Sequence, residues 1–241
     1  ALAQGLSSWG AKLDGSSVIQ FDGQSRPYSD AGSNLDRFYR TGKTWTNNVS
    51  LSGGGENVGY RFSMTNLDNQ GIMPNSGLDR NTFSAAVNGS SGKWLGSLTG
   101  TYVKEEAKNR PRLSDSPGNA NYTAWSLPPS ININDLKGDP NKLGANPEDG
   151  TELGFNDNGF VTNPWWATNQ FAANNEKDRI YGNASLGYEF IDGLVLQGKV
   201  GIDRFTERRT NLTPYGTAYS TLGQLGESNR TVQEVNLEAT L

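Results

Sequence analysis

The sequence predicts an all-β protein: an antiparallel segment of a transmembrane β-barrel, with about seven strands and long loops. Three observations support this fold class. Apolar and polar residues alternate in several runs, and the connections between those runs alternate between short and long. No run approaches the ~20 consecutive apolar residues of a spanning helix. A low hydrophobic share of 34% fits a barrel, because each strand turns only every second residue to lipid.

Four alternating runs come first. Tight turns at 53–57 and 90–93 separate them in pairs, and a longer connection that contains 71–75 joins the pairs. The runs are 44–52, 58–66, 79–89 and 94–105, and their apolar phases are Trp45, Val49 and Leu51; Val58, Tyr60, Phe62 and Met64; Phe83, Ala85 and Val87; and Trp94, Leu98 and Tyr102. Period two of this kind is typical of strands with one apolar and one polar face.

A hairpin follows at 180–202 (IYGNASLGYEFIDGLVLQGKVGI), closed by the turn signal Asp192-Gly193. We expect this turn to face the periplasm, with Tyr188 and Phe190 at the lower membrane interface. Its lipid-facing side chains are expected to be Leu186, Leu196, Val200 and Ile202. A last alternating run covers 231–241.

The connections alternate in length because long ones at 107–175 and 208–229 follow the short turns. This alternation of connection lengths is typical of an outer-membrane barrel, which has tight periplasmic turns and long extracellular loops. A soluble sandwich does not require it. Seven strands form an open set, and an open edge cannot lie in lipid with its backbone groups unpaired. We therefore expect a fragment of a longer barrel.

Aromatic residues gather near the two ends of the predicted strands. Near the short turns these are Tyr60, Phe62, Trp94, Tyr188 and Phe190, and near the long loops they are Trp45, Phe83 and Tyr102. Two interfacial girdles would require this placement. The alternative is that they are ordinary cross-strand aromatic pairs in a soluble core.

The amino-acid composition excludes several kinds of functional site. With no cysteine and no histidine, the chain has no disulfide framework, no Cys or His metal site and no catalytic dyad built on either residue. A net charge of -4 gives no reason to expect nucleic acid as a partner. No signal peptide opens the sequence, so we expect a cytosolic chain or a piece of a longer one. No pair of carboxylates indicates a glycosidase, and we expect no enzyme activity.

Several stretches resemble the SusC-like family of TonB-dependent outer-membrane transporters, typical of Bacteroidetes. They are SWGAKLDG at 8–15, FYRTG at 38–42, TNNVSLSGGGEN at 46–57, SMTNLDNQGIMPNSGLDRNTFS at 63–84, NRP at 109–111, NPWW at 163–166 and KDRIYGNASLGYEF at 177–190. Each motif alone is weak, but their order and spacing cover almost the whole chain. The first motif departs from the family pattern, which usually has proline where Ala11 stands.

The resemblance implies a location in the outer membrane of a Gram-negative bacterium and import of oligosaccharides or peptides driven through TonB. It also implies a 22-stranded barrel, a SusD-like surface lipoprotein over the mouth, and a plug domain and TonB-contacting segment that this chain does not contain. The resemblance divides the chain into a first extracellular loop region at 1–43, four strands at 44–106, a long extracellular loop at 107–175, a hairpin at 176–207, an extracellular loop at 208–229 and a truncated strand at 230–241.

Two groups of side chains are candidates for contacts. The long loop carries aromatic residues suited to substrate or lid contact: Tyr122, Trp125, Phe155, Phe160, Trp165 and Trp166. Packing within the loop is the alternative. The polar residues expected to face the barrel lumen are Arg61, Asn183, Glu189, Gln197, Lys199 and Asp203.

We expect no cofactor. The Asp and Asn clusters GDPN at 138–141, NPEDG at 146–150 and FNDNG at 155–159 contain oxygen ligands suited to calcium, but none has EF-hand spacing and all read equally well as turns. Two other functions stay open at this stage: a soluble or surface all-β binding module, and a passive porin or adhesin barrel.

Overall fold

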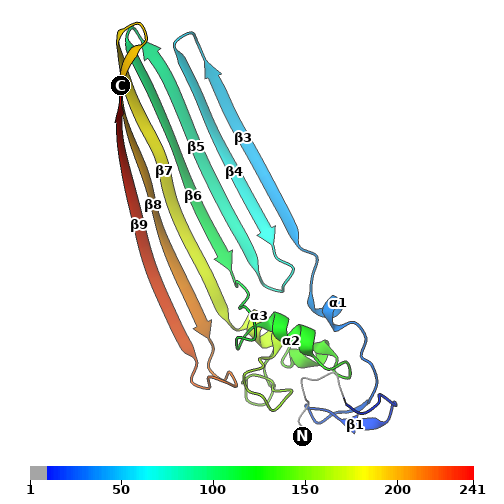
Figure 1. The fold of residues 1–241 in the computed structure, drawn as a ribbon. Coiled ribbons are helices and arrows are strands. Elements are labelled where there is room, and N and C mark those ends of the chain that lie inside the picture. The colour runs from blue at the N-terminus through cyan, green and yellow to red at the C-terminus, as the bar shows by residue number, and fades with distance from the viewer. Residues whose placement is uncertain (1–9) are drawn as a thin grey trace.

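A computed structural model describes residues 10–241, so the first two residues of the SWGAKLDG motif lie outside the described part. Seven long strands form one antiparallel sheet in which each strand pairs with the next along the chain (Figure 1). The strands are β3 (Lys43–Gly54), β4 (Val58–Gln70), β5 (Gly77–Ser91), β6 (Trp94–Lys108), β7 (Ala172–Ile191), β8 (Leu194–Thr213) and β9 (Gln224–Thr240). The predicted fold class is confirmed in strand number, order and direction.

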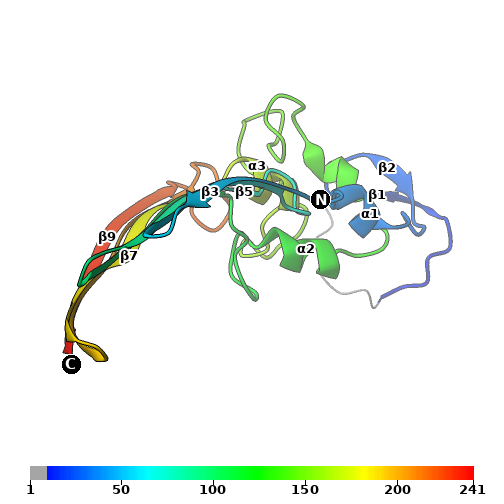
Figure 2. The same ribbon diagram turned by 90° about the horizontal axis from the view of Figure 1, so that it is seen from above.

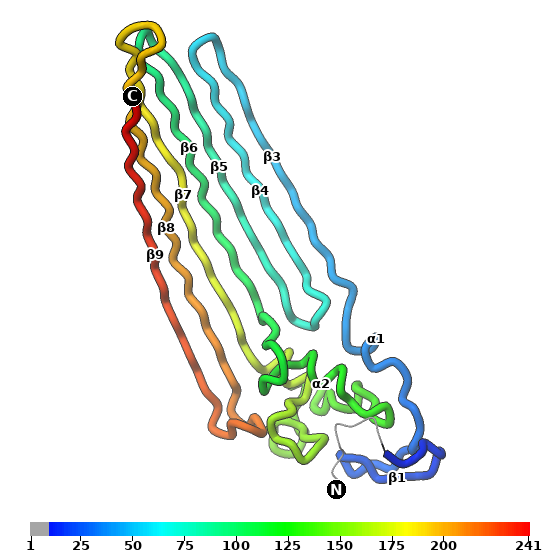
Figure 3. The backbone as a smooth tube through the Cα atoms, in the orientation of Figure 1, coloured from blue at the N-terminus to red at the C-terminus, as the bar shows by residue number. Residues whose placement is uncertain are grey.

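Short and long connections lie at opposite ends of the sheet. The turn end carries the connections 55–57, 92–93 and 192–193, and the loop end carries 71–76, 109–171 and 214–223. Figure 3 shows the tight turns at the top of the trace and the long segments at the bottom. This is the rhythm that the sequence predicts.

The strands at the loop end are longer than the alternation suggests. β8 continues to Thr213 and β9 begins at Gln224, so the connection expected at 208–229 is only 214–223. β7 likewise begins at Ala172. In these extensions polar residues occupy both faces, and the apolar alternation that identifies a strand in the sequence therefore disappears.

The loop domain, residues 10–42 and 109–171, sits at the loop end of the sheet (Figure 1). Seen from above, the sheet is curved and the loop domain lies to one side of it (Figure 2). Its elements are β1 (Ser17–Ile19), β2 (Ser25–Pro27), α1 (Asn34–Phe38), α2 (Ala120–Ser126), the 3-10 helix η1 (Ile133–Lys137) and α3 (Pro164–Asn169). Across residues 10–241, none of the helices is both long and apolar enough to cross a membrane.

The packed core of the molecule lies in the loop domain. Its buried side chains come from segments far apart in the sequence, including Phe38 of α1, Met73 of the β4–β5 connection and Trp165 of α3. Phe38 and Trp165 meet edge to face, with ring centroids 5.2 Å apart. The sheet, in contrast, is a single layer with large apolar side chains exposed on it.

Candidate functional site

One face of the sheet is an exposed apolar belt. The strand register brings the apolar phases of neighbouring strands together, so that one cross-strand row reads Tyr60, Val87, Leu98, Ala184, Val200 and Leu237. Leu237 is 80% exposed and Val49, on the same face, is 74% exposed. Such a face needs an apolar environment outside the described chain.

The belt has the height of a bilayer core. On β7 its apolar residues run from Ile180 to Phe190. Ten residue steps of about 3.3 Å, inclined at about 40°, span about 25 Å, which is the height of the lipid-facing band of an outer-membrane barrel. The row beyond it on the loop side is polar on the same face, with Asn66, Asn81 and Lys104 in register.

Aromatic side chains cluster within this belt. Near the turn end Trp94 contacts Tyr188, which contacts Phe190, with centroid distances of 4.7 and 5.0 Å. Towards the loop end Phe83 stacks on Tyr102 at 6.4 Å. The second pair lies at the edge of the belt, well before the strands end, because the strands continue beyond the belt as polar extensions.

The opposite face of the sheet is polar and carries all six residues expected to face a lumen. Arg61 and Asn183 lie in one cross-strand row, through Ala86 and Thr99. Glu189 lies beside the hairpin turn, where its Oε1 accepts a hydrogen bond from the Gly193 N–H at 3.2 Å. The remaining three are Gln197, Lys199 and Asp203.

Charges on the polar face are paired across strands. Arg179 Nε donates to Asp203 Oδ1 at 2.9 Å, and Arg80 Nε donates to Glu105 Oε2 at 2.7 Å. Both pairs are partly exposed. Paired charges of this kind suit an interior filled with water or protein.

A hollow of about 500 Å³ opens where the polar face meets the loop domain. Among its lining residues are Asn69 and Asn175 of the sheet, Lys108 and Arg110 at the end of β6, and Asn121 of α2. Asn175 is buried and its Oδ1 has no hydrogen-bond partner among the described residues. This site could not be predicted from the sequence, because Asn, Lys and Arg at strand ends are also ordinary turn residues.

The NPWW motif is the centre of the loop domain. Asn163 caps α3: its Oδ1 accepts from Trp165 N–H at 2.9 Å, and its Nδ2 donates to Leu136 O at 2.8 Å and Leu153 O at 3.0 Å. The Trp165 indole donates to Ile133 O at 2.7 Å, and that of Trp166 donates to Thr217 Oγ1 at 3.0 Å. Every polar atom of the motif named here therefore has a partner inside the protein.

A buried carboxylate, Glu152, joins two loops. Its Oε1 accepts from the Asn163 N–H at 2.7 Å, and its Oε2 accepts from the Ala218 N–H at 2.9 Å in the β8–β9 connection. Burial raises the pKa of Glu152 to about 7, against the effect of the two amide donors. Glu152 thus holds the β8–β9 connection against the long loop.

Residues of two other motifs, FYRTG and NRP, form hydrogen bonds that connect the loops at the loop end of the sheet. Arg40 of the FYRTG motif donates to Gly71 O at 2.9 Å and to Ser76 O at 2.8 Å, which fixes the β4–β5 connection. Asn75 donates to Thr168 O at 3.0 Å, and Asn109 of the NRP motif donates to Asn75 O at 3.1 Å. Asn75 and Asn109 both have positive φ, which asparagine tolerates better than most residues.

The six candidate aromatic residues divide into two groups. Phe155, Trp165 and Trp166 are buried in the loop domain, Trp166 completely, which is the position that the packing alternative describes. Trp125 is 71% exposed, Phe160 is 65% exposed, and Tyr122 is also exposed. Only this second group is accessible to a partner.

The three Asp and Asn clusters form turns. Asp139 Oδ1 accepts from Asn141 N–H at 2.8 Å, Asp149 Oδ1 from Thr151 N–H at 2.9 Å, and Asn156 Oδ1 from Asn158 N–H at 2.7 Å. Within residues 10–241, no three acidic side chains gather in a group able to hold a metal ion.

The one-layer sheet has an exposed apolar belt on one face, a polar opposite face and long loops at one end. These features define the chain as a segment of a β-barrel wall. Three solved structures of the RagAB peptide transporter share this fold. The first matches with a TM-score of 0.67 at 15% identity, the importer in its open-open state with 0.66 at 17%, and in its closed-closed state with 0.64 at 18%. Each match covers 93% of this chain and 24% of the other, so the chain spans about a quarter of their length. No protein-family model and no curated protein sequence matches the chain.

Proposed function

We propose that this chain is part of the barrel wall and mouth of a SusC-like, TonB-dependent transporter in the outer membrane of a Gram-negative bacterium. The observation that carries the proposal is the exposed apolar belt, about 25 Å high, backed by a polar face and bounded by long loops at one end only. The family-like motifs and the fold shared with RagAB support it.

In the proposed orientation the turn end faces the periplasm and the loop domain covers part of the extracellular mouth. Arg61, Asn183, Gln197, Lys199 and the other polar-face residues line the lumen beside a plug supplied by the rest of the protein. The wall is a fixed frame, and the plug moves when TonB pulls on it. The transporter is not an enzyme, so its cargo passes through unchanged.

The loop domain offers two contact surfaces. Trp125, Tyr122 and Phe160 are exposed aromatic residues suited to a SusD-like lipoprotein lid, because aromatic side chains supply much of the binding free energy at protein interfaces. The hollow at Asn175 faces inward, with amide groups and the cations of Lys108 and Arg110. The carboxylate of Glu105 also lines it and is paired with Arg80. We propose that the hollow contacts the cargo on its way into the lumen.

The cargo class is peptide or oligosaccharide, and RagAB is a peptide importer, which makes peptides the first class to test. Amide side chains bind the peptide backbone, and Lys108 and Arg110 would bind its carboxylates. A neutral oligosaccharide would use the amides alone.

The test is uptake by cells that express the full-length transporter. Arg110→Gln should weaken uptake of acidic peptides by about tenfold, the effect of losing one charge-assisted contact, and Arg37→Gln on α1 is the matched surface control. Uptake must also fall when TonB is deleted. Recovery of the native protein in the aqueous fraction without detergent would favour a soluble module, and uptake independent of TonB would favour a passive porin.

The lid is tested separately by pull-down of surface lipoproteins with the transporter. Trp125→Ala should reduce recovery of the lid, whereas Leu113→Ala, another exposed apolar residue of the loop domain, should not. Equal recovery with both variants would exclude Trp125 from the interface.

A further inference from the structure

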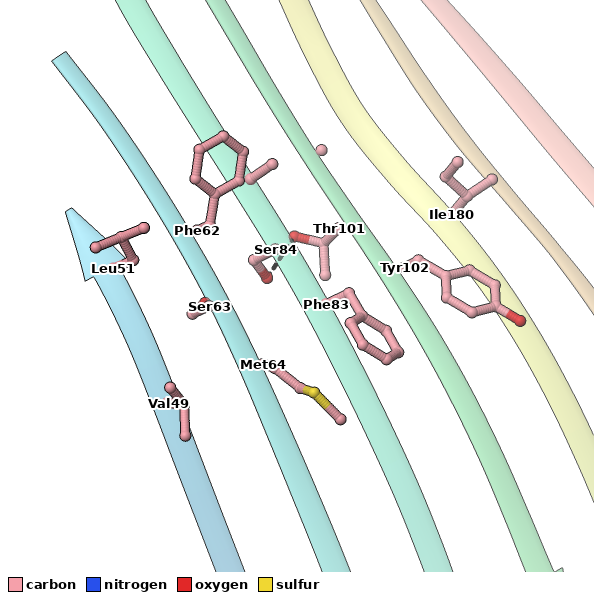
Figure 4. A pocket seen from close by; sticks show the side chains of 12 residues that line it. Val49, Leu51, Phe62, Ser63, Met64, Phe83, Ser84, Thr101, Tyr102 and Ile180 are labelled. Carbon is pink, nitrogen blue, oxygen red and sulfur yellow. Dashed lines mark hydrogen bonds between the residues drawn. The ribbon is translucent and has the colours of Figure 1, made fainter. Parts of the chain in front are cut away.

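Two hollows of similar size lie on opposite faces of the sheet. The belt hollow has about 520 Å³, and the large side chains of Phe62, Phe83 and Tyr102 line it without any amide group (Figure 4). The hollow at Asn175, on the polar face, has about 500 Å³ and combines an apolar wall with amide groups. A mostly apolar wall with a few polar groups is typical of ligand sites of this size, so the second hollow is the one that suits a cargo with polar groups.

One cross-strand row forms the floor of the hollow at Asn175. In register across β4 to β7, it reads Asn69, Leu78, Ala107 and Asn175. Neighbouring strands are about 4.8 Å apart, so the backbones of the two asparagines lie about 14 Å from each other, with Leu78 and Ala107 between them. The centre of the floor is therefore apolar and its two ends are polar.

The apolar wall comes from the β4–β5 connection and from the start of the long loop. Its side chains are those of Ile72, Met73 and Pro111. Ile72 is 61% exposed, yet its backbone is held: its carbonyl oxygen accepts from the Arg40 N–H at 2.9 Å. The Arg40 side chain donates to the carbonyl oxygens of Gly71 and Ser76. Because these bonds fix the connection, Ile72 is a preformed part of the wall, which lowers the entropic cost of binding.

Two amide groups of the lining are oriented by their neighbours. Asn121 Oδ1 accepts from the Tyr39 O–H at 2.7 Å, so its Nδ2 stays available as a donor. Asn69 Nδ2 donates to Thr44 Oγ1 at 2.7 Å, so its Oδ1 stays available as an acceptor. The hollow thus offers an amide donor and an amide acceptor, which match the C=O and N–H groups of a peptide backbone.

The charges of the lining do not require a charged side chain in the hollow. Its one carboxylate is paired, because Glu105 Oε2 accepts from Arg80 Nε at 2.7 Å. Lys108 and Arg110 are exposed cations, which the proposed function assigns to carboxylates of the cargo. The apolar part of the hollow is therefore left for an uncharged group of the same cargo.

An aliphatic side chain fits this surface better than a sugar does. A sugar ring carries hydroxyl groups around its edge, and burial against Ile72, Leu78 and Ala107 would leave some of them without hydrogen bonds. A side chain of the size of leucine loses no hydrogen bond there and gains free energy by burial. The composition of the wall therefore favours a peptide over an oligosaccharide.

We propose that the hollow at Asn175 binds an aliphatic side chain of a peptide cargo, with the peptide backbone at the amide groups of Asn69 and Asn121. This inference rests on the proposed function. It adds the kind of residue that the mouth of the transporter selects.

Titration of the purified full-length transporter with two synthetic peptides tests the proposal. The peptides have the same length and charge and differ at one central position, which is leucine in one and serine in the other. Wild type should bind the leucine peptide roughly tenfold more tightly, the effect of burying one such side chain. Ile72→Ser should reduce this preference by about threefold or more, because part of the apolar wall is lost.

Ile19→Ser is the matched control. Ile19 of β1 is 59% exposed, close to the 61% of Ile72, and does not line the hollow. This variant should keep the preference of wild type for the leucine peptide. An equal loss of preference in Ile19→Ser and Ile72→Ser would contradict the proposal.

Equal affinity of wild type for the two peptides would overturn the proposal, and so would tighter binding of a neutral oligosaccharide than of either peptide. Uptake of the peptides independent of TonB would instead overturn the proposed function. Because the preference is measured on purified protein without TonB, the two failures are distinguishable.

Discussion

The sheet and the loop domain place apolar side chains in opposite ways. Within the belt the large apolar side chains of β3 to β9 are exposed on one face, as Leu237 and Val49 are. In the loop domain Phe155, Trp165 and Trp166 are enclosed, and Asn and Asp form the surface turns. One chain thus fits two environments, an apolar one around the belt and water around the loops.

The largest effect should come from the interior of the loop domain. Trp166→Ala removes a fully buried ring and its hydrogen bond to Thr217, and should lower the free energy of unfolding of the loop domain by about 3–5 kcal/mol. Hydrogen exchange should show faster exchange in 109–171, with the strands protected as before. Trp125→Ala, at an exposed position, is the control. An equal loss of stability in both variants would contradict the burial of Trp166 in the core of the loop domain.

A charge placed on either face of one strand tests the belt. Leu98→Arg puts a cation in the middle of the belt and should cost about 2–4 kcal/mol in folding into liposomes, whereas Thr99→Arg on the polar face should be tolerated. Urea titration in liposomes measures both. If Thr99→Arg were the more damaging change, the assignment of the two faces would have to be reversed.

The loop domain should lose stability as the pH rises, through Glu152. Its pKa is about 7 in the folded chain and near 4.5 unfolded, so between these values the unfolded carboxyl ionises first. The free energy of unfolding should therefore fall between pH 4.5 and 7, by at most roughly 3 kcal/mol, and level off above. Urea titrations of the loop-domain transition across this range check it, and Glu152→Gln should remove the slope.

The smallest effect is expected for the ion pair on the polar face. Asp203→Asn removes the partner of Arg179, but both side chains are more than a third exposed. Its cost should stay below about 1 kcal/mol and shrink further in salt. A loss of stability comparable to that of Trp166→Ala would mean that this ion pair is buried against protein rather than exposed to water.

Alternation predicted the sheet well because each strand has one face in an apolar environment. Ile180 to Phe190 shows this directly: both the strand and its outward residues follow from period two. At Arg208 to Thr213, the end of β8, polar residues occupy both faces and Leu212 is the one apolar residue, so alternation gives no signal there. The loop domain could not be predicted, since Phe38, Met73 and Trp165 are distant in sequence and meet only through tertiary packing.

The polar extension of β7 also has a consequence outside transport. From Ala172 to Ile180 it covers eight residue steps, which at the same inclination raise the loop domain about 20 Å beyond the belt. In the proposed orientation that distance carries Trp125 and its neighbours out towards the sugars at the cell surface. An antibody or a phage approaching the bacterium would meet this domain before it met the membrane.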